Sequence, residues 1–221
     1  MSENRIPRIL EPAPDFEAKS THGDIKLSDY TAKGKWVMLF SHPSDFTPVC
    51  STEFIEFARR ASDFERLNVQ IIGVSIDSVY SHIAWLRDIE SMAGVQIKFP
   101  LIADLDQKVS QAYGLVHEVA SDTATVRAVF AIDPTGKIRA LMYYPMQLGR
   151  NVDELLRIFE GLQTSDANGV SCPANWVPGK QVIVPAPITI ADAAKRTNGG
   201  GAGLDVSTWY LSKKDLAFAT R

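Results

Sequence analysis

The sequence predicts an α/β fold with a mixed central sheet, flanking helices and an extended C-terminal arm. Three observations lead to this prediction. Apolar runs of strand length alternate with segments whose apolar residues recur at helical spacing. A turn that contains proline and glycine then joins two further apolar runs as an antiparallel pair. The C-terminal part follows neither pattern and is rich in proline and glycine.

The first strand is predicted at residues 36–41, an apolar run bounded by glycine and proline that fits a strand buried on both faces. From Phe54 to Leu67, apolar residues recur every three or four positions, which predicts a helix with one buried face. Cys50 therefore lies near a helix N-terminus.

The next buried strand is predicted at residues 69–76, and Asp77 or Ser78 can cap the helix that follows. A weaker strand is expected at residues 98–103. A short helix is expected at residues 104–113, closed by a glycine. Alternation of strand and helix favours parallel pairing in this part of the sheet.

A hairpin is predicted from residues 126–132 and 137–143, because Pro134 and Gly136 between them suit a tight turn. The last amphipathic helix is expected at residues 152–162. We place the end of this domain at residue 165.

Residues 166–221 are expected to form an arm rather than a second core. Trp176, Trp209 and Tyr210 are too apolar to remain in water, so the arm must pack on its own domain or on another subunit. We favour another subunit, which makes the protein a homodimer.

The composition of the chain excludes several classes of function. The chain has 221 residues, 45% of them apolar, which fits one domain with an extension. Lys and Arg (23) nearly balance Asp and Glu (26), which argues against a nucleic-acid partner. We expect a cytoplasmic protein without a membrane partner, since there is no apolar N-terminal stretch or membrane span. Two cysteines, Cys50 and Cys172, exclude a disulfide scaffold or a four-thiolate zinc site within one chain.

Cys50 is the candidate nucleophile, because the positive end of a helix dipole favours the reactive thiolate. The alternative is an inert core cysteine. Thr47 can hydrogen-bond a thiolate or a peroxide, or it can simply cap the helix. Arg127 is the charged residue of an apolar strand and must meet an anion, either in a structural ion pair or at a reacting site.

Residues 41–53, Ser-His-Pro-Ser-Asp-Phe-Thr-Pro-Val-Cys-Ser-Thr-Glu, resemble the active-site signature of the peroxiredoxins, particularly the one-cysteine group. Further matches extend the resemblance over nearly the whole chain. They are residues 74–78 with His82 and Trp85, the Arg127 strand, residues 149–154 and residues 173–176.

This resemblance implies a thioredoxin-like fold, a peroxide substrate, and no cofactor or metal. It assigns the attack to Cys50, the polarisation of the peroxide to Thr47 and Arg127, and the shielding of the cysteine sulfenic acid to Pro43. Hydrogen peroxide and organic hydroperoxides are the expected substrates. The family also assembles dimers into decamers.

Three further residues are expected to support the site. Glu53, one helical turn after Cys50, can orient Arg127. Arg150 resembles a second arginine of the family network, or is a solvated surface residue. His42 can tune the pocket through its ionisation, or serves packing alone.

Regeneration of the cysteine is predicted to follow the one-cysteine mechanism. The arm resembles that of archaeal-type relatives that carry cysteines there, but this chain has Ser207 and Ser212, which cannot form a disulfide. Cys172 is a less favoured resolving partner. We therefore expect an external thiol or a redox protein as the reductant.

Other functions would use the same cysteine. A redox sensor or holdase chaperone is the main alternative. A thioredoxin-type dithiol exchanger would need a cysteine where Glu53 stands. A cysteine hydrolase would pair Cys50 with His42, His82 or His117.

Overall fold

The computed structural model describes residues 5–117, 119–121, 123–199 and 201–216. Its contacts divide the chain into two units, residues 1–152 and 153–221. This division falls at the start of the last helix of the α/β domain, whereas the predicted boundary after residue 165 falls near that helix's end. The two units are described separately.

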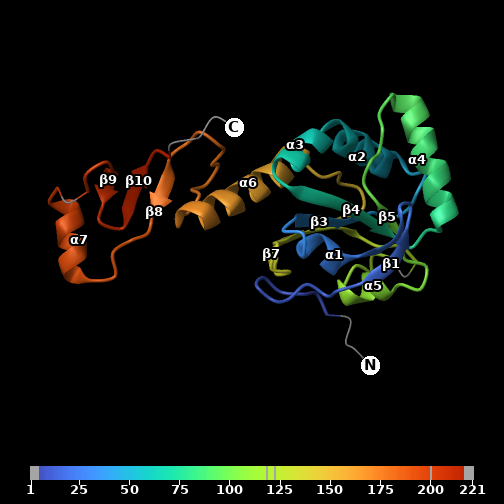
Figure 1. The fold of residues 1–221 in the computed structure, drawn as a ribbon, viewed down its shortest axis with the longest axis horizontal. Coiled ribbons are helices and arrows are strands. Elements are labelled where there is room, and N and C mark those ends of the chain that lie inside the picture. Colours follow the sequence, from blue (N-terminus) through green and yellow to red (C-terminus); the bar gives the residue numbers. More distant parts are fainter. Residues whose placement is uncertain (1–4, 118, 122, 200, 217–221) are drawn as a thin grey trace. The chain divides into compact units, whose positions relative to one another are not determined.

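The first unit alternates strands and helices (Figure 1). Its strands are β1 (Glu17–Ser20), β2 (Gly23–Lys26), β3 (Trp36–Ser41), β4 (Val69–Ser75), β5 (Leu101–Ala103), β6 (Arg127–Ile132) and β7 (Ile138–Tyr144). Its helices are α1 (Leu27–Thr31), α2 (Pro48–Arg59), α3 (Ala61–Arg66), α4 (Val79–Ala93) and α5 (Lys108–Ala112). Helix α6 (Val152–Asn168) begins at the division.

The seven strands form one mixed sheet in the order β2-β1-β5-β4-β3-β6-β7. Strands β3, β4 and β5 are parallel neighbours, while β6 runs antiparallel to β3 and to β7. Helices α2, α3 and α4 lie over one face of the sheet, and α1 and α5 lie over the other (Figure 1). The predicted α/β fold with a mixed sheet is confirmed.

The central strand β3 is buried along its whole length. Successive side chains of a strand point to opposite faces, so β3 serves two cores. Val37 and Leu39 belong to a cluster that includes Leu27 of α1 and Val109 of α5. Phe40 instead contacts an aromatic group from α2 and the segment before β5, made of Phe54, Phe57 and Phe99. This aromatic packing holds α2 against the sheet.

Some predicted elements differ in extent. The helix predicted through Leu67 breaks at Arg60, whose ψ of 9° leaves the helical range, and so becomes α2 and α3. Strand β5 and helix α5 are shorter than predicted. The carboxylate of Asp104 accepts hydrogen bonds from the backbone N–H groups of Val109 and Ser110 and thereby caps the first turn of α5 from outside the helix.

The second unit contains β8 (Val182–Val184), α7 (Ile190–Thr197), β9 (Asp205–Thr208) and β10 (Leu211–Lys214). The strands form an antiparallel sheet in the order β8-β10-β9. Val170, Trp176 and Val182 form a small buried cluster, with Cys172 and Leu216 packed against it. We expected an arm without a second core; the second unit nevertheless has a small buried cluster and a sheet of its own.

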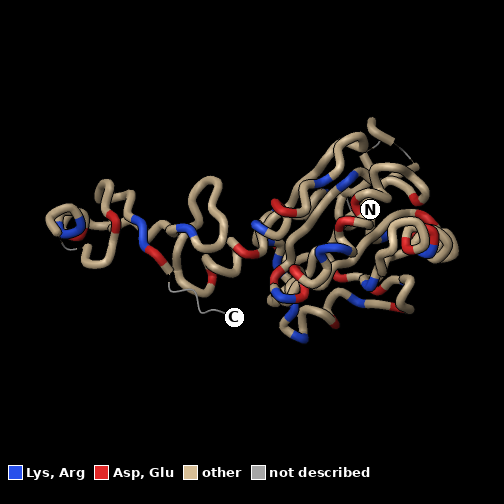
Figure 2. The backbone as a smooth tube through the Cα atoms, turned by 90° about the horizontal axis from the view of Figure 1, so that it is seen from above, with Lys and Arg blue, Asp and Glu red and all other residues tan. Residues whose placement is uncertain are grey.

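Charged residues of both signs are interspersed along the chain (Figure 2). Among the described residues, no helix is both long enough and apolar enough to cross a membrane.

Candidate active site

Cys50 lies in the first turn of α2 and its side chain is fully buried. Thr47 is the N-cap residue with extended backbone, and Pro48 follows at the first helical position. Proline suits this position because its fixed φ is helical and it lacks an N–H that would have no partner there. The local sequence thus starts the helix just before the sulfur and directs the positive end of the helix dipole at it.

Arg127, the first residue of β6, contacts the sulfur of Cys50. Its Nη1 atom donates a hydrogen bond to Sγ of Cys50 over 3.2 Å. Its Nε and Nη2 atoms both donate to the carbonyl oxygen of Met146, at 3.0 and 2.8 Å. The guanidinium is therefore fixed from two sides, which keeps Nη1 directed at the thiol.

Glu53 binds both arginines that the sequence singled out. Its Oε2 accepts from Nη1 of Arg127 at 2.8 Å and from Nη2 of Arg150 at 2.5 Å, and its Oε1 accepts from Nε of Arg150 at 2.8 Å. Burial would raise the pKa of Glu53, but Arg150 and Arg127 outweigh it and hold the pKa below its ordinary value. Two cations face one carboxylate, so this group carries one excess positive charge beside Cys50.

Arg150 is a buried residue and not a solvated surface arginine. Its Nη1 donates to the carbonyl oxygens of Ser41 and Ala128 at 2.9 and 3.0 Å. Its guanidinium also lies over the rings of Phe40 and Phe57. Arg150 thereby ties α2 to the ends of β3 and β6, where the sulfur lies.

The hydroxyl of Thr47 makes no capping hydrogen bond, although Thr47 occupies the N-cap position. It donates instead to the carbonyl oxygen of Ser44 at 2.8 Å. Its oxygen lone pairs therefore stay available as acceptors. Pro43 is buried in the same loop, between β3 and α2.

His42 and His82 share the carboxylate of Asp45. Nε2 of His42 lies 3.0 Å from Oδ1, and Nδ1 of His82 lies 2.8 Å from Oδ2. Burial would raise the pKa of Asp45, but the hydrogen bonds from His42 and His82 outweigh it and hold the pKa far below its ordinary value. The pKa of His42 is lowered, chiefly by burial. Its ring also stacks on Trp85 and meets Phe54 edge-on.

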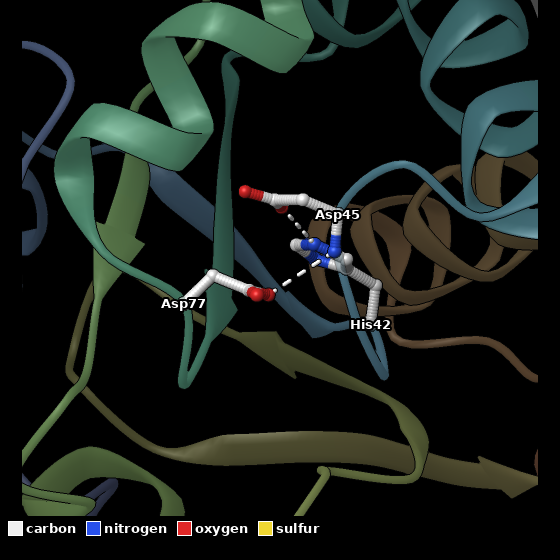
Figure 3. A group of neighbouring side chains, drawn as sticks. All are labelled: His42, Asp45 and Asp77. Carbon is white, nitrogen blue, oxygen red and sulfur yellow. Dashed lines mark hydrogen bonds and ion pairs between the residues drawn. The ribbon is translucent and has the colours of Figure 1, made fainter.

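Figure 3 shows His42, Asp45 and Asp77 gathered between the β3–α2 loop and the end of β4. Their ligand atoms lie within 4.8 Å of one another, a spacing that a metal ion could bridge. The Asp77 carboxylate, however, already accepts from the backbone N–H of Asp45 and the hydroxyl of Ser75. Both Asp45 oxygens face histidine nitrogens. These occupied acceptors describe a hydrogen-bonded network rather than a metal centre.

The structure thus joins Cys50, Arg127, Glu53 and Arg150 in one chain of contacts: Arg127 contacts Sγ of Cys50, and Glu53 links Arg127 to Arg150. Sequence reasoning did not identify the Asp45–His82 pair, which joins positions 37 residues apart. It also missed the carbonyl groups of Met146 and Ser44. Backbone acceptors leave no signal in residue type, whereas Asp45 lies inside the segment that first drew attention to Cys50.

The second cysteine and the two arm serines lie in the second unit. Cys172 is partly buried, and its sulfur lies 3.5 Å from the carbonyl oxygen of Gly161. Ser212 is buried in β10, where its hydroxyl donates to the carbonyl oxygen of Thr208. Ser207 lies in β9.

A thioredoxin-like fold that places a cysteine and an arginine together at the start of a helix defines a class of thiol-based redox enzymes. Residues 9–141 match the family model described as AhpC/TSA family, and residues 161–200 match the C-terminal domain of 1-Cys peroxiredoxin. The chain belongs to the AhpC/TSA family, the peroxiredoxins. It is accordingly a thiol-dependent peroxidase, with a peroxide as substrate and a thiol as reductant.

Curated relatives resemble the chain over nearly its full length. A peroxiredoxin of Aquifex aeolicus is 48% identical, covering 96% of this chain and 98% of its own. A peroxiredoxin of Thermoplasma volcanium is 50% identical, covering 93% of this chain and 98% of its own.

Solved structures agree with the fold. The yeast mitochondrial 1-Cys peroxiredoxin, studied for thiol resolution through the glutathione and thioredoxin systems, matches with a TM-score of 0.83 and 36% identity. That match covers 96% of this chain and 100% of the yeast chain. A cysteine-to-serine mutant of peroxiredoxin 6 of Arenicola marina has a TM-score of 0.84 and 31% identity, covering 96% of this chain and 99% of its own.

Proposed function

We propose that this peroxidase reduces hydrogen peroxide and organic hydroperoxides with Cys50 as the nucleophile, and that an external thiol regenerates it by a one-cysteine mechanism. The observation that carries the proposal is the hydrogen bond from Nη1 of Arg127 to Sγ of Cys50 in the first turn of α2. A dipole end and a group with one excess positive charge meet at this sulfur, and both favour an anion there.

The first step is attack of the Cys50 thiolate on one oxygen of the peroxide. The S–O bond forms while the O–O bond breaks, and the departing oxygen leaves as hydroxide or alkoxide and takes a proton to become water or an alcohol. Cys50 is oxidised to a sulfenic acid and the peroxide is reduced. Negative charge develops on the departing oxygen, so fixed donors beside the sulfur accelerate the step.

Arg127 and Thr47 are proposed to hold the peroxide. The guanidinium is immobilised by Glu53 and the carbonyl oxygen of Met146, so it needs no reorganisation during the reaction. Because the Thr47 hydroxyl donates to Ser44, its oxygen can accept the peroxide O–H. Pro43, buried in the same loop, is proposed to restrict access to the sulfenic acid.

The second step is proposed to use an external thiol. Its sulfur attacks the sulfenic acid, water leaves, and a mixed disulfide forms; a second thiol then releases Cys50 and forms the reductant's disulfide. Ser207 and Ser212 cannot supply a sulfur within the arm. The similarity of residues 161–200 to the C-terminal domain of 1-Cys peroxiredoxin supports this choice.

The test compares Cys50→Ser with the matched variant Cys172→Ser. We expect Cys172→Ser to consume one equivalent of peroxide rapidly and to turn over steadily with a small thiol, while Cys50→Ser does neither. Mass spectrometry of the oxidised protein should locate the sulfenic acid at Cys50. Equal peroxide consumption by both variants would refute Cys50 as nucleophile, and loss of turnover in Cys172→Ser alone would refute the one-cysteine cycle.

A further inference from the structure

The imidazole of His82 faces acceptors on both sides. Nε2 lies 3.1 Å from the carbonyl oxygen of Ile102, and Nδ1 lies 2.8 Å from Oδ2 of Asp45. A carbonyl oxygen only accepts hydrogen bonds, and so does an ionised carboxylate. Both contacts are satisfied together when each ring nitrogen of His82 carries a proton.

The other arrangement, a neutral His82 that accepts a proton shared from Asp45, needs a protonated carboxyl group. The two hydrogen bonds that hold the pKa of Asp45 far below its ordinary value oppose this arrangement. The side chains of Asp45 and His82 are both buried. An ionised Asp45 beside a cationic His82 leaves the pair neutral overall, which lowers the cost of burying either charge.

The protonation of His42 follows from the same carboxylate. Oδ1 of Asp45 accepts from Nε2 of His42 at 3.0 Å, so Nε2 carries the proton. Nδ1 of His42 is buried and has no hydrogen-bond partner among the described residues. A neutral His42 therefore presents a lone pair at Nδ1.

The ring of His42 lies on the face of α2 that carries Cys50. It meets the ring of Phe54, with centroids 5.1 Å apart, and Phe54 is one helical turn after Cys50. The titratable groups around His42 are Asp45 on its own loop, Asp77 after β4 and His82 on α4. The facing residue of α2 is the uncharged Phe54.

We propose that His82 is a positioning residue of the peroxidase site: as a buried cation bound to Asp45, it adds to the effect of burial in keeping His42 neutral and protonated at Nε2. The ring centroids of His42 and His82 are 6.2 Å apart, close enough for repulsion between two cations in a buried site. Asp45 alone would attract a second proton to His42, and the His82 charge cancels that attraction. This inference rests on the proposed function only in taking the face of α2 that carries Cys50 as the peroxide site.

The protonation pattern is tested first in the unmodified protein. The chain has four histidines, so their ring nitrogens are resolvable by long-range ¹⁵N–¹H NMR of histidine-labelled protein. At neutral pH we expect two protonated nitrogens in His82, and in His42 a protonated Nε2 with an unprotonated Nδ1. An unprotonated ring nitrogen in His82, or a protonated Nδ1 in His42, would overturn the proposal.

The role of His82 is tested with His82→Gln, which removes the charge at similar size. We expect the pH midpoint for protonation of His42 to rise by on the order of one pH unit. The matched control is His117→Gln, since His117 stacks on Tyr143 and lies outside the Asp45 network. An unchanged His42 midpoint in folded His82→Gln would overturn the role of His82.

Asp45→Asn gives a second route if His82→Gln does not fold. An amide can donate to Nδ1 of His82, so His82 should lose its second proton at neutral pH, and a still doubly protonated His82 would contradict the proposal. The NMR results do not depend on peroxide chemistry. Failure of the proposed function would appear separately, as an unmodified protein whose Cys50 does not react with peroxide.

Discussion

The carboxylate of Glu53 binds the guanidinium of Arg150 with both oxygens, through Oε1 to Nε at 2.8 Å and Oε2 to Nη2 at 2.5 Å. This bidentate pair is buried and also receives Arg127. Arg150 therefore holds the Glu53 carboxylate in place, and the carboxylate in turn orients Arg127. Each residue around Cys50 can be tested for its own part.

Replacing Glu53 with Gln should destabilise the protein by about 3 kcal/mol, because it leaves two buried arginines without their anion. Urea unfolding measures the loss. The matched variant Glu65→Gln changes an exposed carboxylate on α3 and should leave the free energy of unfolding nearly unchanged. Equal free energies of unfolding in the two variants would show that Glu53 does not stabilise the fold through its two arginines.

Arg127→Lys should lower the single-turnover oxidation rate of Cys50 by about 100-fold, because an ammonium group cannot contact Sγ, Glu53 and the carbonyl oxygen of Met146 together. Stopped-flow measurement with excess peroxide gives the rate. Arg87→Lys, an exposed change on α4, is the control. A rate equal to the control's would remove Arg127 from the proposed mechanism.

Thr47→Val removes the hydroxyl at nearly constant size and should slow the same step about tenfold or more, because the peroxide loses an acceptor. Thr47→Ser retains the hydroxyl and should restore most of the rate. Thr52→Val, on an exposed position of α2, tests whether any loss of a threonine hydroxyl in this helix slows the reaction. If Thr47→Val reacts as fast as Thr52→Val, the hydroxyl has no role in the reaction.

The free energy of unfolding should fall on acidification, because His42 is harder to protonate in the folded protein than in the unfolded chain. The folded pKa of His42 lies below its ordinary value of 6.5, so below about pH 6.5 the unfolded chain binds more protons than the folded one. The contribution is present above pH 6.5 and is lost as pH falls toward the folded pKa. His42→Gln should flatten this slope in urea midpoints measured across pH, whereas the exposed His22→Gln should retain it.

The second unit is proposed to form the homodimer contact. Trp209 and Tyr210 are 45% and 57% exposed, respectively, and stack edge-on against each other at the β9–β10 turn. Trp209→Ser should shift sedimentation velocity toward the monomer, and the exposed Lys180→Ser in the same unit should not. A dimer that persists in Trp209→Ser would place the contact elsewhere.

The sequence predicted the parts of the fold that depend on long apolar runs. Strands β3, β4, β6 and β7 lie within a residue or so of their predicted ranges, since buried strands leave a continuous apolar signal. Strands β1 and β2 were not predicted, because they are short and largely polar. The three-residue strand β8 in the arm was missed for a similar reason: its length is below what a periodic pattern can reveal.

Site residues whose positions depend on local sequence could be predicted, whereas contacts between distant segments could not. The position of Cys50 and Thr47 was predictable because a helix start is local, and Arg127 because a charge in an apolar strand requires an anion. For Arg150, sequence alone left burial and exposure open, since it follows a strand by several loop residues. The pairing of Asp45 with His82 depends on how α4 packs against the β3–α2 loop, which no local spacing encodes.

Because the Cys50 side chain is completely buried, the two steps of the proposed cycle differ in how much space their reactants need beside the sulfur. A peroxide adds only a few atoms beside the sulfur. A reductant must bring its own sulfur into line with the S–O bond, and a protein reductant carries a whole surface with it. We expect a protein thiol to react only after the loop and first turn of α2, from Ser44 to Cys50, have moved aside, whereas a peroxide needs a much smaller opening at the same place.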